Sequence, residues 1–313
     1  MVSRDIPITK MTNVSRRVTG LTLLLVLVAG MAGLALTGCS PRSLTFTDGA
    51  GRTIERQQAP ERIASLSPAH TEILFALGLG EKVVGVSNWC NKPEAALEKE
   101  KVGDAFSLDK EKLVALKPDI VFVPGTEATQ MAKEIEDLGI AVYLSSPGSV
   151  AEVFEDIRRV AKATGVEKQG EDLVARLEQE LDQVSEDIEG LGSSKPSVLI
   201  VLDQELWTVG PGSFMHDVLS RAGGVNIIKD VEMQYLQVSM EEVLANDPDV
   251  ILITVPEDFV TGLKDRPGWS DLKAVKEGKV YFVDGDLTSR QGPSIVDGVK
   301  EFARYLYPEL GDI

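Results

Sequence analysis

Two consecutive helical patterns fill the segment from Val150 to Leu191, and they constrain the fold of this chain more than any other stretch. The first pattern runs to Gly165, with apolar residues at steps of three and four. The second spans Glu167–Glu189, roughly 30 Å of helix at about 1.5 Å per residue, with charged residues around a narrow apolar seam. Glycines, serines and Pro196 follow, so we expect this helix to end near Gly190. The two seams are Val150, Val153, Phe154, Ile157, Val160, Ala161, and Val174, Leu177, Leu181, Val184, Ile188, Leu191.

Short apolar strands alternate with helices both before and after this helical segment. Such alternation predicts parallel sheets covered by helices on both faces. A long helix between two such regions favours a brace joining two lobes, although the pattern alone also permits an ordinary surface helix within a single domain. In the first region we expect strands at 62–66, 83–86, 120–123 and 142–144, and helices at 71–77, at 110–116 and before Gly139. In the second we expect strands at 198–202, 250–253 and 280–283, and helices at 213–221, 240–244 and 295–307.

The two regions also resemble each other. Pro118-Asp119 and Pro248-Asp249 each lie between a short capped helix and an apolar strand, and aligning them places Glu111 on Glu241, 130 residues further along. A match over cap, helix, turn and strand favours two equivalent lobes. The predicted fold class is therefore α/β, with two Rossmann-like lobes joined by a single long helix. We divide the chain into a signal peptide (1–38), a tether with a small hairpin near Asp48 (39–60), the N-terminal lobe (61–148), the connecting helical segment (149–192) and the C-terminal lobe (193–313).

The N-terminus reads as an export signal. Arg16 and Arg17 precede an apolar run that ends in Leu36-Thr37-Gly38-Cys39. This run is short for a membrane span, and its last four residues resemble a bacterial lipobox. Cleavage before Cys39 and attachment of lipid, including palmitate, would anchor the protein on the extracytoplasmic face of the cell membrane through lipid only. An uncut signal anchor is the alternative.

Charge and cysteine content limit the partners. Removing residues 1–38 takes away four basic residues and one acidic residue, which changes the formal net charge from −17 to −20. A chain this acidic is a poor match for nucleic acid, whose phosphates need clustered lysine and arginine. With Cys39 acylated, Cys90 is the one remaining thiol, so the chain cannot form an internal disulfide.

The sequence has no Gly-x-Ser-x-Gly elbow, phosphate-binding loop or dinucleotide fingerprint, so we expect no enzyme, no cofactor and no resident metal. Its two histidines, His70 and His216, fit structural or capping positions better than metal ligation. A remote alternative is a secreted hydrolase that uses His70 with Glu72. The expected loops are aromatic instead, as at the walls of sites for large planar ligands, and Asp286 and Arg290 lie in an expected turn as a polar pair. The loop aromatics are Trp89, Phe106, Trp207 and Tyr235.

Four stretches carry a resemblance to a known family. Arg-Ile-Ala-Ser-Leu-Ser-Pro-Ala-His-Thr-Glu at 62–72, Val-Gly-Val before Trp89, Leu-Val-Ala-Leu-Lys-Pro-Asp at 113–119 and Gln-Val-Ser-Met-Glu-Glu-Val-Leu at 237–244 resemble the cobalamin and ferric-siderophore binding proteins of ABC importers. The resemblance covers about residues 60–310. It implies a monomer that holds a small-molecule ligand in a cleft between its lobes, moves little at its hinge, and delivers the ligand to a permease dimer with ATPase subunits.

Within that family the chain is most similar to the cobalamin-binding branch. The resemblance places Trp89, Trp207 and Tyr235 at aromatic cleft positions, with Phe106 beside a further one, and Asp286 and Arg290 at a polar pair on the rim. Ser67 and His70 are expected at the cleft too. Ala105 and Pro124 stand where that branch can carry tryptophans, and His70 stands where asparagine is common. The resemblance also implies that Glu111 and Glu241 meet arginines of the permease. The leading hypothesis is a corrinoid receptor, and the rival is a ferric-siderophore or haem receptor of the same fold, with Arg290 facing anionic groups and His70 or Tyr235 as iron ligands.

Overall fold

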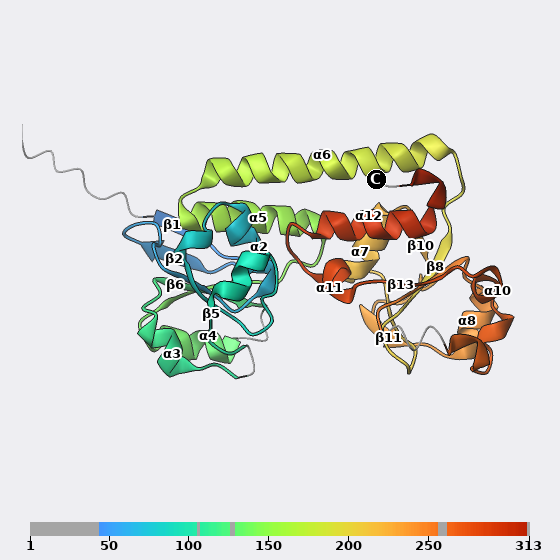
Figure 1. Cartoon of the computed structure of the whole chain (residues 1–313), viewed down its shortest axis with the longest axis horizontal. Coiled ribbons are helices and arrows are strands. Elements are labelled where there is room, and N and C mark those ends of the chain that lie inside the picture. Colours follow the sequence, from blue (N-terminus) through green and yellow to red (C-terminus); the bar gives the residue numbers. More distant parts are fainter. Residues whose placement is uncertain (1–43, 105–106, 126–128, 256–261, 312–313) are drawn as a thin grey trace, which may run out of the picture. The chain divides into compact units, whose positions relative to one another are not determined.

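The computed structural model describes residues 44–104, 107–125, 129–255 and 262–311 (Figure 1). The chain from Leu44 onward forms one compact unit by its internal contacts. The expected signal peptide and the expected lipidation site, Cys39, lie outside the described residues. Among the helices of the described ranges, none has the length and apolar content needed to cross a membrane.

The N-terminal lobe is built on a five-stranded parallel sheet of order β5-β4-β3-β6-β7. The strands at its centre are apolar along their whole length because helices cover both faces, and Ile120, Val121, Phe122 and Val123 are all fully buried. The strands are β3 (Ile63–Ser65), β4 (Val83–Val86), β5 (Glu100–Lys101), β6 (Ile120–Pro124) and β7 (Ala141–Ser145), and the helices are α2 (Pro68–Ala76), α3 (Lys110–Ala115) and α4 (Thr129–Glu136).

The C-terminal lobe repeats this plan with a four-stranded parallel sheet of order β10-β8-β12-β13. A separate antiparallel ladder joins β9 (Trp207–Val209) to β11 (Tyr235–Gln237). The sheet strands are β8 (Ser197–Val201), β10 (Val225–Asn226), β12 (Val250–Ile253) and β13 (Val280–Phe282), and the helices are α7 (Phe214–Arg221), α8 (Met240–Asn246), α10 (Lys273–Glu277), α11 (Gly285–Ser289) and α12 (Ile295–Leu306).

The internal repeat expected from the sequence extends to backbone geometry. Lys117 and Asp247 both adopt a positive φ, 47° and 36°, immediately before the matched prolines. The aspartates that follow these prolines play the same part in each lobe: Asp119 accepts a hydrogen bond from the backbone N–H of Arg62, and Asp249 from that of Ser197. Each carboxylate thereby fastens the start of the neighbouring strand, so the prediction of two matched α/β lobes is confirmed.

Two helices form the connecting segment, α5 (Val150–Thr164) and α6 (Glu167–Leu191). Gly165, with φ 73°, ends α5 and allows the chain to turn back. The apolar seams are buried as predicted, and a Cβ at Gly170 would come within 2.4 Å of the Ala161 Cβ, which shows how closely the two helices pack. At 25 residues α6 is about 37 Å long, and it ends at Leu191, one residue beyond the expected stop at Gly190.

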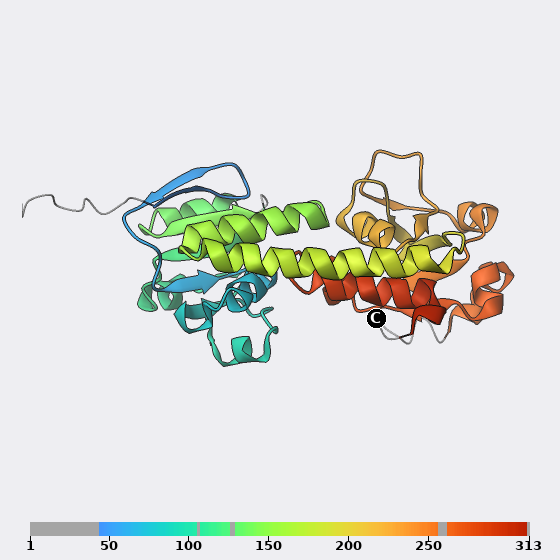
Figure 2. The ribbon, with the colours of Figure 1, turned by 90° about the horizontal axis from the view of Figure 1, so that it is seen from above.

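The long helix α6 lies against both lobes. It packs on α5 at the N-terminal lobe and on α12 at the C-terminal lobe, as both views show (Figures 1 and 2). Lys300 of α12 donates to Glu180 of α6 at 2.9 Å. At the other end of α5, the backbone N–H of Val150 donates to Asp217 of α7 at 2.8 Å. The connecting segment is thus fastened to both lobes rather than lying free between them.

A hairpin precedes the first lobe, as expected near Asp48. It pairs β1 (Leu44–Thr47) with β2 (Thr53–Arg56), and the Asp48 carboxylate accepts from the backbone N–H of Arg52 at 2.8 Å. Phe46 is 1% exposed and its ring stacks near Tyr143. Residues 44–56 of the segment that we divided off as a tether therefore belong to the packed body of the N-terminal lobe.

Candidate functional site: a cleft between the two lobes

A hollow of about 420 Å³ opens between the lobes. Its walls come from the start of α2, from the loop after β4 and from α11 with the residues that follow it. Both sheets contribute at the carboxyl ends of their strands, where open α/β sheets usually bind ligands. The lining residues are Ser67, Pro68, Ala69, Asn88, Trp89, Asn91 and Pro124 of the N-terminal lobe, and Asp286, Ser289, Arg290 and Gln291 of the C-terminal lobe.

Local sequence explains how the N-terminal wall is held. Ser67 caps α2 by accepting a hydrogen bond from the backbone N–H of His70, and Pro68 occupies the first helical position, where a missing N–H costs nothing. Trp89 is the largest apolar side chain of this wall; it lies in the loop after β4 and is 66% exposed. The large exposed face of an indole is unusual on a protein surface and favours contact with a ligand.

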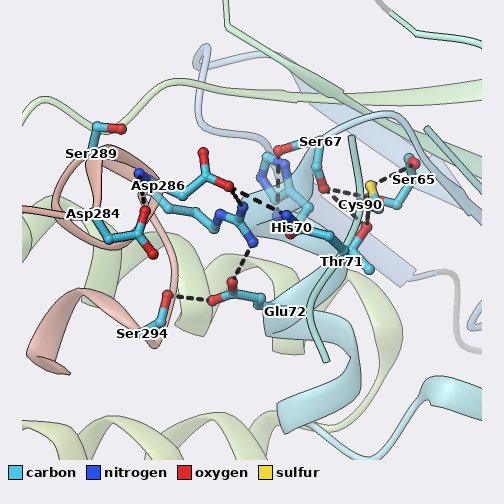
Figure 3. Close-up of polar contacts among 12 residues, drawn as sticks. Ser65, Ser67, His70, Thr71, Glu72, Cys90, Asp284, Asp286, Ser289 and Ser294 are labelled. Atoms are coloured by element: carbon cyan, nitrogen blue, oxygen red, sulfur yellow. Dashed lines mark hydrogen bonds and ion pairs between the residues drawn. The ribbon is translucent and has the colours of Figure 1, made fainter. Parts of the chain in front are cut away.

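An ion-pair cluster closes the floor of the cleft and joins the lobes. Arg290 donates through Nη1 to Glu72 of α2 at 2.9 Å and through Nη2 to Asp286 of α11 at 2.7 Å. Ser294 donates to the second oxygen of Glu72 at 2.6 Å, and Asn91 donates weakly to Asp286 at 3.4 Å. Figure 3 shows Glu72 facing Ser294 across the two lobes.

The cluster corrects one expectation. Asp286 and Arg290 were expected in a turn, as a polar pair on the rim of the cleft, but Asp286 lies in the helix α11 and Arg290 is only 8% exposed. Glu72, which the sequence offered only as part of a hydrolase, is the partner that buries the guanidinium. The separation of 218 residues between Glu72 and Arg290 left no local signal of this pairing.

His70 lies in the core rather than at the cleft. It is 2% exposed, and its Nε2 lies 3.0 Å from the Asp156 carboxylate of α5, between the rings of Phe122 and Tyr143. Tyr143 donates to the other Asp156 oxygen at 2.7 Å. Burial raises the pKa of Asp156, but hydrogen bonds, chiefly from His70 and then from Tyr143, outweigh it and hold that pKa below its usual value. Burial, followed by the Asp156 charge, raises the pKa of Tyr143 well above its usual value.

This placement bears on two alternatives. The side chain of His70 is 3% exposed and already engaged, so it does not present a base to a substrate beside Glu72, as the hydrolase alternative requires. It does not line the cleft as an iron ligand either. Over the residues that the structure describes, no group of three or more His, Cys, Asp or Glu side chains is placed to hold a metal ion.

Trp207 and Tyr235 are brought together, but away from the hollow described above. Trp207 pairs with Gln237 in the β9–β11 ladder, and Tyr235 lies two residues before Gln237 on the same strand. The side chains of Trp207 and Tyr235 therefore share one face of the ladder as diagonal neighbours. They are 42% and 48% exposed, and neither lines the hollow. Phe106, the fourth expected aromatic, lies outside the described residues.

Glu111 and Glu241 occupy matching places. Each is the second residue of its helix, α3 or α8, after the capping side chain of Asp109 or Ser239. Both are exposed, and the structure shows no ion pair for either among the described residues. The helix dipole favours a carboxylate in the first turn, so it explains the presence of each glutamate when the two are considered separately.

Comparison with known proteins decides the family. The sequence model for the periplasmic binding protein family matches residues 63–287. The chain belongs to this family. An uncharacterized ABC transporter substrate-binding lipoprotein, YvrC of Bacillus subtilis, is 33% identical over 273 residues, covering 85% of this chain and 86% of YvrC. The vitamin B12-binding protein of Vibrio cholerae is 31% identical over 250 residues, covering 79% of this chain and 89% of its own length.

Solved structures agree with the fold. The periplasmic heme-binding protein RhuT from Roseiflexus sp. RS-1 superposes with a TM-score of 0.69 at 27% identity, covering 80% of this chain and 99% of RhuT. The chain is accordingly an ABC-importer substrate-binding protein of the group that includes cobalamin, siderophore and haem receptors. Members of this periplasmic binding protein family act outside the cytoplasm as transport proteins and work with a permease and an ATPase.

Proposed function

We propose that this periplasmic binding protein takes up cobalamin or a related corrinoid and delivers it to an ABC importer. The observation that carries the proposal is the cleft between the lobes, where the exposed ring of Trp89 lies among side-chain amides and hydroxyls. A corrinoid presents a broad ring surface edged by amide groups, which complements such a lining. The similarity to the Vibrio cholerae vitamin B12-binding protein supports the same ligand class.

Calorimetric titration of the purified full-length chain in detergent with cyanocobalamin and cobinamide tests this proposal. We expect saturable binding of at least one of the two. No heat of binding with protein and ligand at tens of micromolar would refute the corrinoid assignment.

A haem or ferric-siderophore receptor is the second candidate, and the similarity to RhuT favours it. Absorbance difference spectra with haemin and with ferric siderophores separate it from the first. A Soret shift with haemin, together with no corrinoid binding, would establish the rival.

Membrane attachment is proposed through the lipid on Cys39. Cys39→Ser should abolish incorporation of labelled palmitate. Unchanged palmitate labelling of that variant would contradict the proposed anchor.

Docking to the permease is proposed through Glu111 and Glu241, one on each lobe. Two matched, exposed carboxylates suit a permease dimer, with one glutamate meeting each subunit. We expect Glu111→Ala with Glu241→Ala to abolish uptake in cells, with ligand affinity and melting temperature nearly unchanged. Normal uptake by the double variant would reduce both residues to helix-end charges, whereas lost affinity would place them at the ligand.

A further inference from the structure

Arg290 is the one arginine among the described residues that line the cleft, and its charge is already neutralised. Its two terminal nitrogens donate to Glu72 and to Asp286, and its side chain is 6% exposed. A free guanidinium offers a fork of donors to carboxylates, and that fork is the usual means of binding them. In Arg290 these donors are already bound to the carboxylates of Glu72 and Asp286, so the three side chains together carry one net negative charge.

The rest of the lining supplies no positive charge. Apart from Asp286 and Arg290, every described lining residue is neutral. Lys92 lines a different hollow, which Glu72 and Ser294 also line, and Lys101 donates to backbone carbonyls of Ser87 and Cys90. The internal segments that the structure leaves undescribed, 105–106, 126–128 and 256–261, contain no lysine or arginine.

Several contacts hold this arrangement in place. Glu72 is 8% exposed and bound at both oxygens, by Arg290 and by Ser294. A Cβ at Gly292 would lie 3.2 Å from the Ala69 carbonyl oxygen and 3.2 Å from Glu72 Oε2, so the two lobes touch closely at this point. Freeing Arg290 for a ligand would leave the buried Glu72 carboxylate without its partner, which is costly.

We propose that Glu72 is a specificity-determining residue, because it neutralises Arg290 and so makes the cleft select ligands edged by amides and hydroxyls over ligands that carry carboxylates. The inference rests on this cleft being the ligand site of the proposed function. Asp286 takes part directly: its Oδ2 is bound to Arg290 and Asn91, while Oδ1 accepts no hydrogen bond from the described residues and is available to an N–H donor of the ligand. Glu72 does not line the cleft hollow; it acts through its ion pair with Arg290, as a positioning residue.

The test compares two ligands of the same shape. Cyanocobalamin and the derivative in which one peripheral amide is hydrolysed to a carboxylate differ by one charge, and haemin adds a planar ligand with two carboxylates. The protein variants are Glu72→Gln, which removes the charge while its oxygen can still accept from Arg290 and its amide NH2 can donate to the Ser294 hydroxyl, and Ser294→Ala as the matched control, which removes one hydrogen bond but leaves every charge. Dissociation constants are measured in full-length protein, at low and at high salt.

We expect the wild type and Ser294→Ala to prefer the amide over the carboxylate by about tenfold, which corresponds to about 1.4 kcal/mol. Glu72→Gln should reduce that preference to less than about threefold, raise haemin affinity about tenfold and leave cyanocobalamin affinity within about threefold. The preference should shrink at high salt, as a charge effect does. If Glu72→Gln does not fold, Asp286→Asn, whose side chain is 58% exposed, should produce the same loss of preference.

Equal binding of amide and carboxylate by the wild type, or haemin binding as tight as corrinoid binding, overturns the inference while leaving the proposed function intact. An unchanged preference in both Glu72→Gln and Asp286→Asn overturns it as well. If no corrinoid binds, the proposed function fails, and the haemin measurements still decide: a gain of about tenfold in Glu72→Gln supports the selection against carboxylates, and no gain refutes it.

Discussion

Replacing Asp156 with alanine should destabilise this protein more than any other single carboxylate deletion on the connecting helices. Asp156 is 1% exposed and is hydrogen-bonded to both the Tyr143 hydroxyl and the His70 ring. Its loss therefore leaves two buried polar groups without this partner. The three side chains tie β7, α2 and α5 together, and α5 carries the fastening to the C-terminal lobe.

The size of the destabilisation follows from the two groups, Tyr143 and His70, that would lose their hydrogen bonds to Asp156. Leaving a buried polar group unsatisfied costs about 1–3 kcal/mol, and breaking a buried pair by removing one partner costs about 3–5 kcal/mol. We therefore expect Asp156→Ala to lower the free energy of unfolding by about 3–5 kcal/mol, out of the roughly 5–15 kcal/mol typical of folded domains. Asp156→Asn keeps an acceptor for Tyr143 and should cost less, about 1–3 kcal/mol.

Urea unfolding followed by circular dichroism measures the effect, with Glu155→Ala as the matched control. Glu155 is the preceding residue on the same helix, and its side chain is 56% exposed in a surface pair with Arg158. Its deletion should change the free energy by less than about 1 kcal/mol. The Asp156→Ala midpoint should fall by roughly 1–2 M urea. Equal midpoints for the two alanine variants would show that the buried cluster contributes no more than a surface ion pair.

The pH dependence has a definite sign. Because the folded pKa of Asp156 lies below the usual 3.8, the carboxylate stabilises the fold fully above that value and loses its contribution as pH falls through the folded pKa. The stability difference between wild type and Asp156→Asn should therefore be constant near neutral pH and shrink below about pH 4. A difference that grows in acid would refute the assignment of a lowered pKa.

Three further outcomes are expected. Cys90 is fully buried beside the Ser87 and Thr71 hydroxyls, so a thiol reagent should modify it only in denaturant; rapid labelling of the native protein would contradict that burial. Asp249, with its pKa lowered to about 2 chiefly by a hydrogen bond from Lys273, should contribute about 1 kcal/mol after solvent screening, so Asp249→Asn should lower the melting temperature at pH 7 but not near pH 2. Trp89→Ala should weaken ligand binding by about 1–3 kcal/mol at an unchanged melting temperature, because Trp89 lines the cleft and is 66% exposed; unchanged binding with a lowered melting temperature would contradict that placement.

The sequence predicted the scaffold well because that scaffold depends on periodic burial. The apolar seams of α5 and α6 are set by residues three and four apart, and the caps of α3 and α8 lie within three residues of the groups they bind. The matched turns at Pro118 and Pro248 are likewise local in the chain. Patterns of this range are visible in a single sequence.

The floor of the cleft could not be predicted in the same way. Glu72 and Arg290 meet only because two separate lobes are held in a fixed relation, and neither has a neighbour in sequence that shows it. The burial of His70 did leave a signal: Asp156 falls three residues after Val153 and four before Val160, on the apolar face of its helix. A carboxylate on that face requires a buried partner, and His70 in a strand–helix turn was a candidate.

Because α6 is one continuous helix, its length sets the distance between its two ends, and its rotation per residue sets the direction in which the chain leaves it. Each inserted residue would lengthen the helix by about 1.5 Å and rotate everything beyond it by about 100°. Seven inserted residues would restore the rotation to within about 20°, yet displace the far end by about 10 Å, much further than the ion pair between Glu72 and Arg290 can span. The cleft width is therefore encoded in a residue count, and variation in length belongs in the loops of either lobe rather than between Glu167 and Leu191.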